Sequence, residues 1–174
     1  MYNSYEIHHD RGLDRLKDEK TIHLIGHIIY ITLYISLITS SIIFYNSANL
    51  ATLLYAGWVI FACGLAILVI SSQTRRRAHQ VKEALIQSGI YGYVRHPEFL
   101  GHMLIITSLT LMAQHPISVV IGVVLLLLLC IEIIEEDKRN IEKFGDAYRD
   151  YMRKVPRINL LAGIIKSARE RRSG

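Results

Sequence analysis

The chain has 174 residues, of which 51% are hydrophobic, and its formal net charge is +5 at pH 7. This length suits one domain, and so apolar a composition excludes an ordinary soluble protein of the same size. The 20 Lys and Arg residues lie before, between or after long apolar runs. The positive charge therefore indicates a membrane protein, and we expect no nucleic-acid partner.

Apolar runs of membrane-spanning character recur along the chain, at Ile22–Phe44, Leu50–Ser71, Phe99–Ala113 and Ile117–Ile134. A hydrocarbon core requires about 20 residues of helix. The third run is short and counts as a span only together with its neighbour. We predict an all-α fold, a polytopic membrane helical bundle with four transmembrane helices, in a single integral membrane domain over residues 1–174 whose four-span bundle covers residues 22–134.

The segment before the first run, residues 1–20, is polar and charged and is expected to form a short surface helix or a loose tail. The first run is too long for a cleaved signal peptide, so it should remain in the mature protein. His23 and His27 have a spacing that suits a metal, but no further ligand is in view and we expect none. Cys63 and Cys130 lie within apolar runs and are interpreted as packing residues.

The distribution of charge predicts the topology. The turns Tyr45–Asn49 and Gln114–Pro116 carry no charge, whereas all Lys and Arg residues lie in residues 1–20, in residues 75–95 or from Lys138 onward. By the positive-inside rule both termini are expected in the cytoplasm. Arg75–Arg77 is interpreted as a topology signal that also contacts anionic membrane lipids.

Small residues in the second run predict close helix packing, at Gly57, Ala62, Gly64 and Ala66. After this run, from Arg75 to Ser88, apolar positions at helical spacing predict a segment lying along the membrane surface. Gly89 is expected to stop that helix.

The polar and aromatic stretch Gly89–Gly101 is the main candidate site. Pro97 is favoured in the first turn of a helix, which leaves Arg95 and His96 just outside the third span. Helix N-termini attract anions. We therefore expect a site for a charged small molecule here.

The short turn Gln114–Pro116 predicts an antiparallel hairpin, which brings Arg95–Gly101 next to Glu132–Asp137. Glu132 and Glu136 are four residues apart and share a helix face, with Glu135 one step round. Carboxylates at the end of an apolar span mark a functional site by default. The alternative is that they simply end the span in water.

Residues 138–174 are predicted to form a cytosolic C-terminal helix and tail. Apolar residues from Ile141 to Val155 follow helical spacing, so an amphipathic helix should lie over the mouth of the bundle until Pro156 ends it. The basic tail from Ile158 is expected to follow the bilayer surface.

An ordered set of motifs runs from Val81 to Arg157: Gly89-Ile90-Tyr91, Arg95-His96-Pro97, the hairpin, Glu135-Glu136-Asp137, and Phe144-Gly145 with Tyr148 and Tyr151. It resembles the isoprenylcysteine carboxyl methyltransferase and phospholipid methyltransferase family of integral membrane enzymes. The resemblance implies a helical membrane protein that binds S-adenosylmethionine on its cytosolic side. It also implies that a lipophilic small molecule or lipid, entering from the bilayer, is the methyl acceptor.

The resemblance also assigns residues by position. The cofactor-binding residues it implies are Glu83, Ala84, Leu85, Ile86, Tyr91, His96, Pro97, Glu98, Phe99 and Glu136. Arg95 and Glu132 take the catalytic positions. Arg95 or His96 is expected to hold the cofactor carboxylate, and Glu136 its amine or ribose hydroxyls.

Glu132 departs from the family pattern. The carboxyl methyltransferases have an arginine there, suited to a substrate carboxylate. A glutamate would repel a carboxylate and favour an amine or a hydroxyl, so an isoprenylcysteine-like carboxylate and an amine-bearing lipid both stay open as acceptors.

Two other functions remain. The sterol reductases also have a His-Pro pair, an acidic pair and a Tyr-rich helix near their C-terminus, but they use NADPH. In a non-catalytic membrane interaction protein, Arg95, His96 and Glu136 would form only an interfacial ion cluster.

Overall fold

The computed structural model describes residues 3–81 and 84–173 of the chain. The elements in chain order are α1 (Asn3–Ile43), α2 (Ala51–Gln80), the 3-10 helix η1 (Gly89–Gly92), α3 (Pro97–Ala113), α4 (Pro116–Phe144), α5 (Asp146–Lys154) and α6 (Leu160–Ser173). The described part of the chain contains no strand. The all-α prediction is confirmed.

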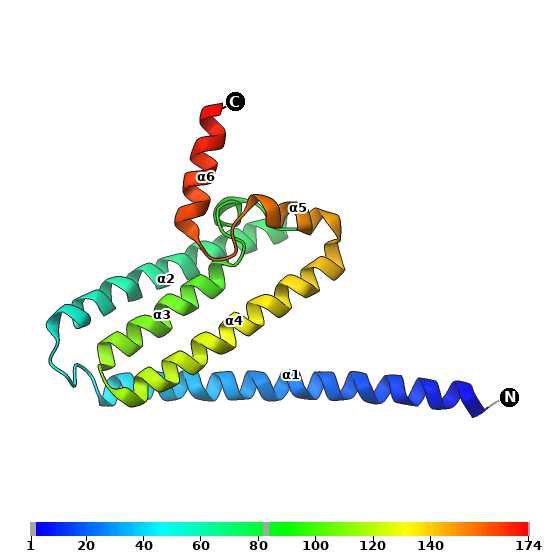
Figure 1. Ribbon diagram of the computed structural model, residues 1–174, viewed down its shortest axis with the longest axis horizontal. Helices are drawn as coiled ribbons and strands as arrows, with labels where there is room; N and C mark the ends of the chain where they lie inside the picture. Colours follow the sequence, from blue (N-terminus) through cyan, green and yellow to red (C-terminus); the bar gives the residue numbers. More distant parts are fainter. Residues whose placement is uncertain (1–2, 82–83, 174) are drawn as a thin grey trace.

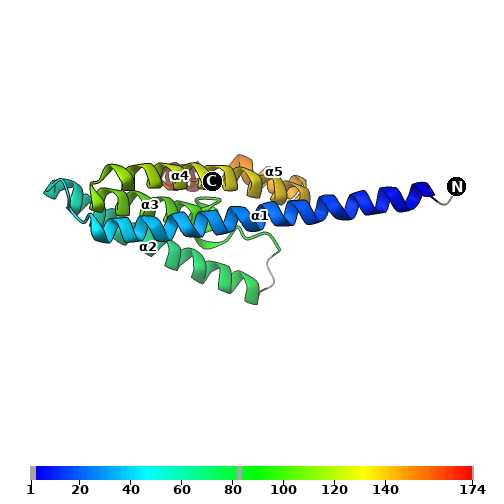
Figure 2. The same cartoon turned by 90° about the horizontal axis from the view of Figure 1, so that it is seen from below.

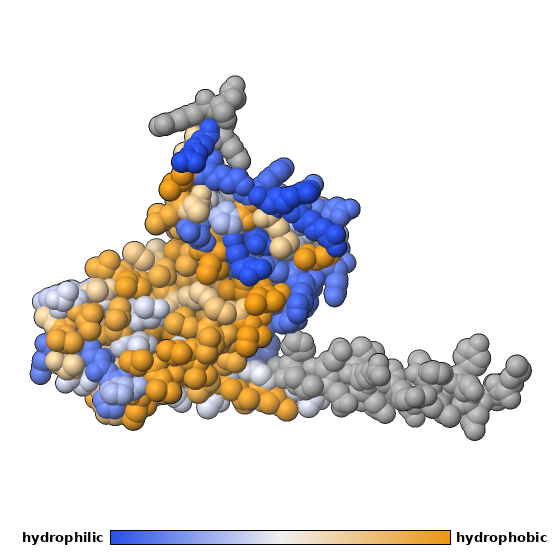
Figure 3. Space-filling model, viewed as in Figure 1, coloured by the Kyte–Doolittle hydropathy of each residue, from blue (hydrophilic) through white to orange (hydrophobic). Residues whose placement is uncertain are grey.

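Three helical segments within the described residues are long and apolar enough to cross a membrane: Leu24–Ile43, Ala51–Gln80 and Pro116–Phe144. The shorter apolar helix α3 packs among them and has 17 residues. An apolar surface covers the lower part of the molecule in Figure 3, whereas polar residues gather around α5. The chain is therefore a helical membrane bundle.

Helices α2, α3 and α4 lie side by side, and α1 runs along α3 and α4 (Figures 1 and 2). Leu37 of α1, Ile106 of α3 and Leu125 of α4 are fully buried at the centre of this packing. α1 also continues through most of the polar N-terminal segment, so that segment belongs to the same helix as the first span and is not a separate tail.

The contact between α2 and α3 depends on small residues. A Cβ atom added at Gly64 would lie 3.0 Å from the carbonyl oxygen of Gly101, so the two backbones approach closely. Gly57 likewise faces α3, which confirms the prediction for both glycines. Ala62 and Ala66 are exposed and take no part in this contact, because they project from the opposite side of α2.

The turns at the end of the bundle away from α5 join α1 to α2 and α3 to α4 (Figure 1). Pro97 and Pro116 stand in the first turns of α3 and α4, as expected of a residue without an N–H group. Gln114 has a left-handed backbone, and its side-chain amide exchanges two hydrogen bonds of 2.9 Å with the backbone of Leu50. The predicted antiparallel hairpin of α3 and α4 is confirmed (Figure 1).

Two helix ends differ from the prediction. α2 continues through the three arginines to Gln80, where a separate surface segment was expected, because Ala78 still packs inward and is only 2% exposed. Gly89 accordingly opens η1, with φ +56°, and does not end a helix.

α4 also extends beyond its apolar run, to Phe144. The predicted amphipathic helix over Ile141–Val155 is interrupted at Gly145, whose φ of +56° is a left-handed value that glycine adopts without strain. The shorter helix α5 follows, and its Tyr148 and Tyr151 pack with Val155 over the polar end of the bundle. The tail contains a further helix, α6.

Candidate functional site

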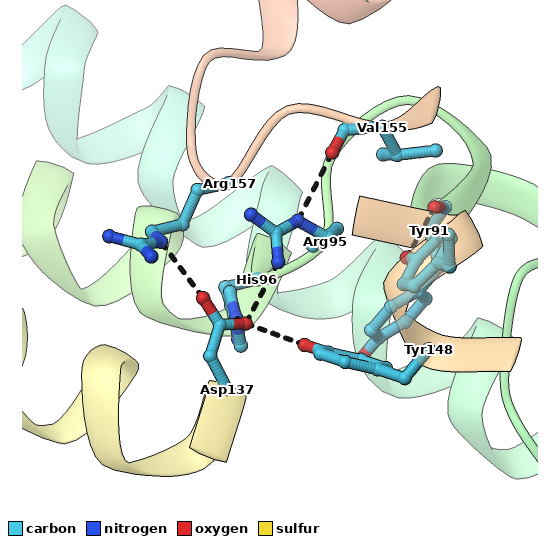
Figure 4. A network of polar contacts seen from close by, with 8 residues as sticks. Tyr91, Arg95, His96, Asp137, Tyr148, Val155 and Arg157 are labelled. Carbon is cyan, nitrogen blue, oxygen red and sulfur yellow. Dashed lines mark hydrogen bonds and ion pairs between the residues drawn. The ribbon is translucent and has the colours of Figure 1, made fainter. Parts of the chain in front are cut away.

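The carboxylate of Asp137 is the centre of a buried polar network at one end of the bundle (Figure 4). Its Oδ1 accepts hydrogen bonds from Nη1 of Arg95 at 3.0 Å and from the Tyr148 hydroxyl at 2.6 Å. Nε2 of His96 lies 2.8 Å from the same oxygen. Oδ2 accepts from Nε of Arg157 at 2.9 Å. Bonds of this kind to a charged acceptor are among the stronger ones in proteins.

The network joins segments that are far apart in sequence. Arg95 and His96 precede α3, Asp137 lies on α4, and Tyr148 lies on α5. Arg95 also donates from Nε to the carbonyl oxygen of Val155 at 3.1 Å. The start of α3 is therefore held to α4 and to the segment that follows α5.

The backbone strengthens this junction. The N–H group of Arg95 donates to the carbonyl oxygen of Pro156 at 3.0 Å, and that of His96 donates to Arg157 at 3.1 Å. Both N–H groups come just before the first turn of α3, where no intrahelical partner exists. The segment after α5 thus occupies donors that the sequence reasoning had left open for an anion.

Arg95 and His96 are consequently placed differently from the expectation. Their side chains are 6% and 3% exposed, and both contact Asp137. Asp137, which the sequence reasoning did not single out, is the buried acid of the hairpin. The signal available in the sequence was that Asp137 lies four residues after Ile133. Residues at this spacing share a helix face, and Ile133 is buried.

Two tyrosines of α5 link the network to η1. The Tyr151 hydroxyl donates to the carbonyl oxygen of Tyr91 at 2.7 Å. Burial, together with the hydrogen bond to Asp137, raises the pKa of Tyr148 to about 12. The pKa of Tyr91 is also raised, mainly by burial and secondly by the negative charge of the nearby Glu98 carboxylate. Both phenols are therefore protonated hydrogen-bonding groups at neutral pH.

A polar cleft of about 270 Å³ lies beside this network. It is lined by residues of α2, η1, α4, α5 and the loops between them: Arg75, His79, Ala84, Leu85, Ile86, Tyr91, Arg95, His96, Glu136, Asn140, Lys143, Phe144, Tyr148 and Tyr151. Six of the ten residues assigned to cofactor binding lie here: Ala84, Leu85, Ile86, Tyr91, His96 and Glu136. Glu83 lies outside the described residues.

The sequence reasoning missed several residues of the cleft. Arg75 and His79 belong to the helical extension of α2, and Asn140 and Lys143 to that of α4. Helix was predicted from Arg75 and from Ile141, but as separate segments and not as continuations of α2 and α4. The signal for these residues is their spacing. Arg75 and His79 are four residues apart, as are Glu136 and Asn140, so each pair lies on one helix face.

Three of the remaining predicted residues, Glu98, Phe99 and Glu132, line a second, largely apolar cavity of about 530 Å³ between α1, α3 and α4. Its lining is Gly26, His27, Tyr30, Glu98, Phe99, His102, Leu128, Leu129, Ile131, Glu132 and Glu135. Glu132, expected near Glu136 in one site, thus faces a different space. Pro97 is fully buried and lines neither space.

The two spaces meet at the start of α3. His96 lines the cleft and Phe99 lines the cavity, with ring centroids 5.7 Å apart in an edge-to-face contact. Glu98 lines the cavity but forms an ion pair with Arg75, a residue of the cleft. One turn of α3 therefore separates a polar compartment from an apolar one.

The residues of the cleft fit the groups of S-adenosylmethionine. Arg75, His79 and Lys143 can hold a carboxylate, while Glu136 can accept from hydroxyl or ammonium groups. The buried Tyr91 hydroxyl has no well-formed hydrogen-bond partner within the described residues, although the Arg75 guanidinium lies beside it. No group of three metal-binding side chains gathers in the described part of the chain.

The fold and these spaces define the class: a helical membrane protein with a polar cleft and an apolar cavity that adjoin at one end of its bundle. The chain belongs to the family described as "Protein of unknown function (DUF1295)", whose family model matches residues 9–155. Neither a curated protein nor a solved structure matches the chain.

Proposed function

We propose that the protein is a membrane methyltransferase that uses S-adenosylmethionine and methylates a lipophilic acceptor. The observation that carries this proposal is the adjacency of the two spaces across the His96–Phe99 contact. A water-soluble methyl donor and an acceptor dissolved in the bilayer need separate entrances and a common meeting point. The polar cleft and the apolar cavity supply both.

The cleft residues would bind and orient the donor. Arg75 and Lys143 attract its carboxylate, and Glu136 accepts hydrogen bonds from its amine or its ribose hydroxyls. Leu85, Ile86 and Phe144 offer apolar surface to a flat base. The Asp137 network positions these side chains because it fixes α3, α4 and α5 relative to one another.

The bound donor supplies a methyl carbon that its sulfonium has already activated. The protein's contribution is then to align the acceptor with that carbon. Holding two reactants in the correct geometry raises their effective concentration and so accelerates the reaction. Phe99 and Glu98 stand at the boundary where the acceptor and the donor would meet.

Size favours this function over a nicotinamide-dependent reductase. Small-molecule sites typically have volumes of about 300–1,000 Å³. The cleft, at about 270 Å³, is near the lower limit. This suits a single nucleoside with a short amino-acid chain better than a dinucleotide with three phosphates.

The test is isothermal titration of the full chain in lipid nanodiscs with S-adenosylhomocysteine and, separately, with NADPH. We expect micromolar binding of the first and none of the second. Glu136→Gln should weaken the binding at least tenfold, whereas Glu142→Gln should not, because Glu142 is exposed on the same helix and does not line the cleft. Binding of NADPH alone, or of neither compound, would overturn the proposal.

The proposed orientation has both termini and the polar cleft in the cytoplasm, since the basic residues gather at that end of the bundle. Protease access to a C-terminal tag in sealed inverted vesicles, but not in right-side-out ones, is the expected result.

A further inference from the structure

The apolar cavity has the features of a binding site for one lipophilic molecule. Its volume of about 530 Å³ lies within the range of drug-sized ligand sites. Tyr30 of α1, Phe99 of α3 and Leu129 of α4 form its walls. Ile131, also in the lining, is 57% exposed on the outer surface of an apolar helix, so the cavity borders the bilayer.

The charges at the rim of the cavity are already neutralised. Glu98 pairs with Arg75, Glu132 with Arg139 at 2.6 Å, and Glu135 with Lys138 at 2.7 Å. No Lys or Arg lines the cavity within the described residues. A carboxylate acceptor would meet acidic groups with no cation to hold it. An ammonium acceptor would have to displace an arginine or a lysine from its partner.

His102 is the polar side chain that α3 places in the cavity lining beyond Glu98. Its Nδ1 is buried and has no hydrogen-bond partner within the described residues. Its ring packs nearly perpendicular to that of Tyr34, at a centroid distance of 6.0 Å. An imidazole nitrogen without a hydrogen-bond partner keeps its capacity to accept a proton. The imidazole can thus take up a proton from a ligand in the cavity.

We propose that the methyl acceptor is a lipophilic molecule with a neutral hydroxyl group, that it occupies this cavity, and that His102 accepts the hydroxyl proton. This inference rests on the proposed methyl transfer and specifies its acceptor class. A neutral hydroxyl satisfies the imidazole without requiring a free charge at the rim. It also explains why a base is present where a carboxylate acceptor, already ionised, would need none.

A lone pair of the acceptor oxygen forms the new bond to the methyl carbon while the carbon–sulfur bond of the donor breaks, and its electron pair stays on sulfur. The hydroxyl proton passes to the His102 imidazole and then to water. General-base catalysis of this type contributes about 10²–10⁴-fold to a rate.

The binding test uses three labelled probes of similar shape: 4-nonylphenol, 4-nonylbenzylamine, which is a cation at neutral pH, and 4-nonylbenzoate. Their partition is measured between nanodiscs that contain the full chain and empty nanodiscs. We expect saturable excess binding of the phenol, at least tenfold tighter than that of either other probe. Equal or tighter binding of the benzylamine or the benzoate would overturn the assignment of a hydroxyl acceptor, as would no saturable binding of any probe.

A cavity-filling variant locates the bound probe. A Cβ atom at Gly26 would have no atom within 4 Å, so Gly26→Phe can extend into the cavity without a backbone clash. We expect it to abolish phenol binding. Ile28→Phe, on the exposed side of the same helix, is the matched control, and this variant should bind the phenol as tightly as the wild type. Phenol binding that survives in Gly26→Phe would place the probe elsewhere and contradict the proposal.

His102→Gln separates this inference from the proposed function. It should leave S-adenosylhomocysteine affinity unchanged, because His102 does not line the cleft. Methylation of the phenol should fall about 10²-fold or more at neutral pH and recover only at the alkaline pH where the phenol ionises by itself. An unchanged rate and pH profile would refute the role of His102 even if the methyl donor binds. Absence of S-adenosylhomocysteine binding would instead refute the proposed function, and the partition of the phenol would still decide whether the cavity is a hydroxyl site.

Discussion

Arg95 and Asp137 are 42 positions apart in the chain, yet their side chains meet at 3.0 Å and are only 6% and 5% exposed. The same carboxylate is bound by His96, Tyr148 and Arg157. Both charges are thus desolvated and compensated within one cluster. The polar end of the bundle depends on a single acidic side chain.

Asp137→Asn should therefore destabilise the protein strongly. Removal of one partner from a buried ion pair typically costs about 3–5 kcal/mol, because the other charge is left uncompensated. Thermal unfolding in detergent should show a large drop in midpoint. Asp150→Asn is the control, since its ion pair with Arg153 is exposed and such pairs contribute about 0–1 kcal/mol. Equal midpoints for the two variants would contradict the central role of Asp137.

Tyr148 predicts a dependence of stability on alkaline pH. Its pKa is about 12 in the folded protein and about 10 when it is unfolded. Because the pKa is higher in the folded protein, Tyr148 makes its full contribution to the free energy of unfolding below pH 10. That contribution is lost as the pH rises from about 10 to 12.

The measurement compares the wild type with Tyr148→Phe. The variant should be less stable at neutral pH by about 1.5–3 kcal/mol, the usual contribution of a hydrogen bond to a charged group. This difference should shrink as the pH rises above 10. Tyr55→Phe, at a residue that is 70% exposed, should show neither effect. A stability difference that grows with pH would have the wrong sign.

Gly101→Ala should loosen the contact of α2 with α3. The added Cβ would lie 2.7 Å from Cδ2 of Leu68 and 3.1 Å from the carbonyl oxygen of Gly64, so the helices must separate. Overpacking of this type costs about 1–3 kcal/mol. Gly26→Ala, where nothing lies within 4 Å, should be neutral or stabilising. The comparison fails if both alanines have the same effect on the unfolding midpoint.

Glu132→Gln should not alter the affinity for S-adenosylhomocysteine. Glu132 lines the apolar cavity and pairs with Arg139, whereas Glu136 lines the polar cleft. Titration of Glu132→Gln beside Glu136→Gln should separate the two acids, with only the second variant impaired. Equal losses in both would mean that the two spaces form one donor site.

The sequence predicted the apolar part of each helix better than its polar extensions, such as the start of α1 at Asn3. Pro97 and Pro116 mark the first turns of α3 and α4, since proline has no N–H group to lose there. The ends of α2 and α4 extend well beyond their apolar runs. Hydropathy detects the part of a helix that contacts lipid and carries no information on where a polar extension stops.

The meeting of Arg95 with the acidic end of α4 was predicted from the hairpin, but the partner was one residue off. Glu136 faces the cleft, and Asp137 faces Arg95. Adjacent residues on a helix point about 100° apart. The rotation of α4 about its axis is set by packing against α1 and α3, which the charged pattern alone does not encode.

The backbone bonds between the start of α3 and residues 156–157 have a consequence for biosynthesis. Arg95 and His96 are translated 41 or more residues before Asp137, the partner that compensates them. Val155 follows Arg95 by 60 residues. The membrane spans are thus synthesised while this end of the bundle is still open. The junction between the start of α3 and residues 155–157 can form only after these residues have been synthesised, later than all the candidate membrane spans.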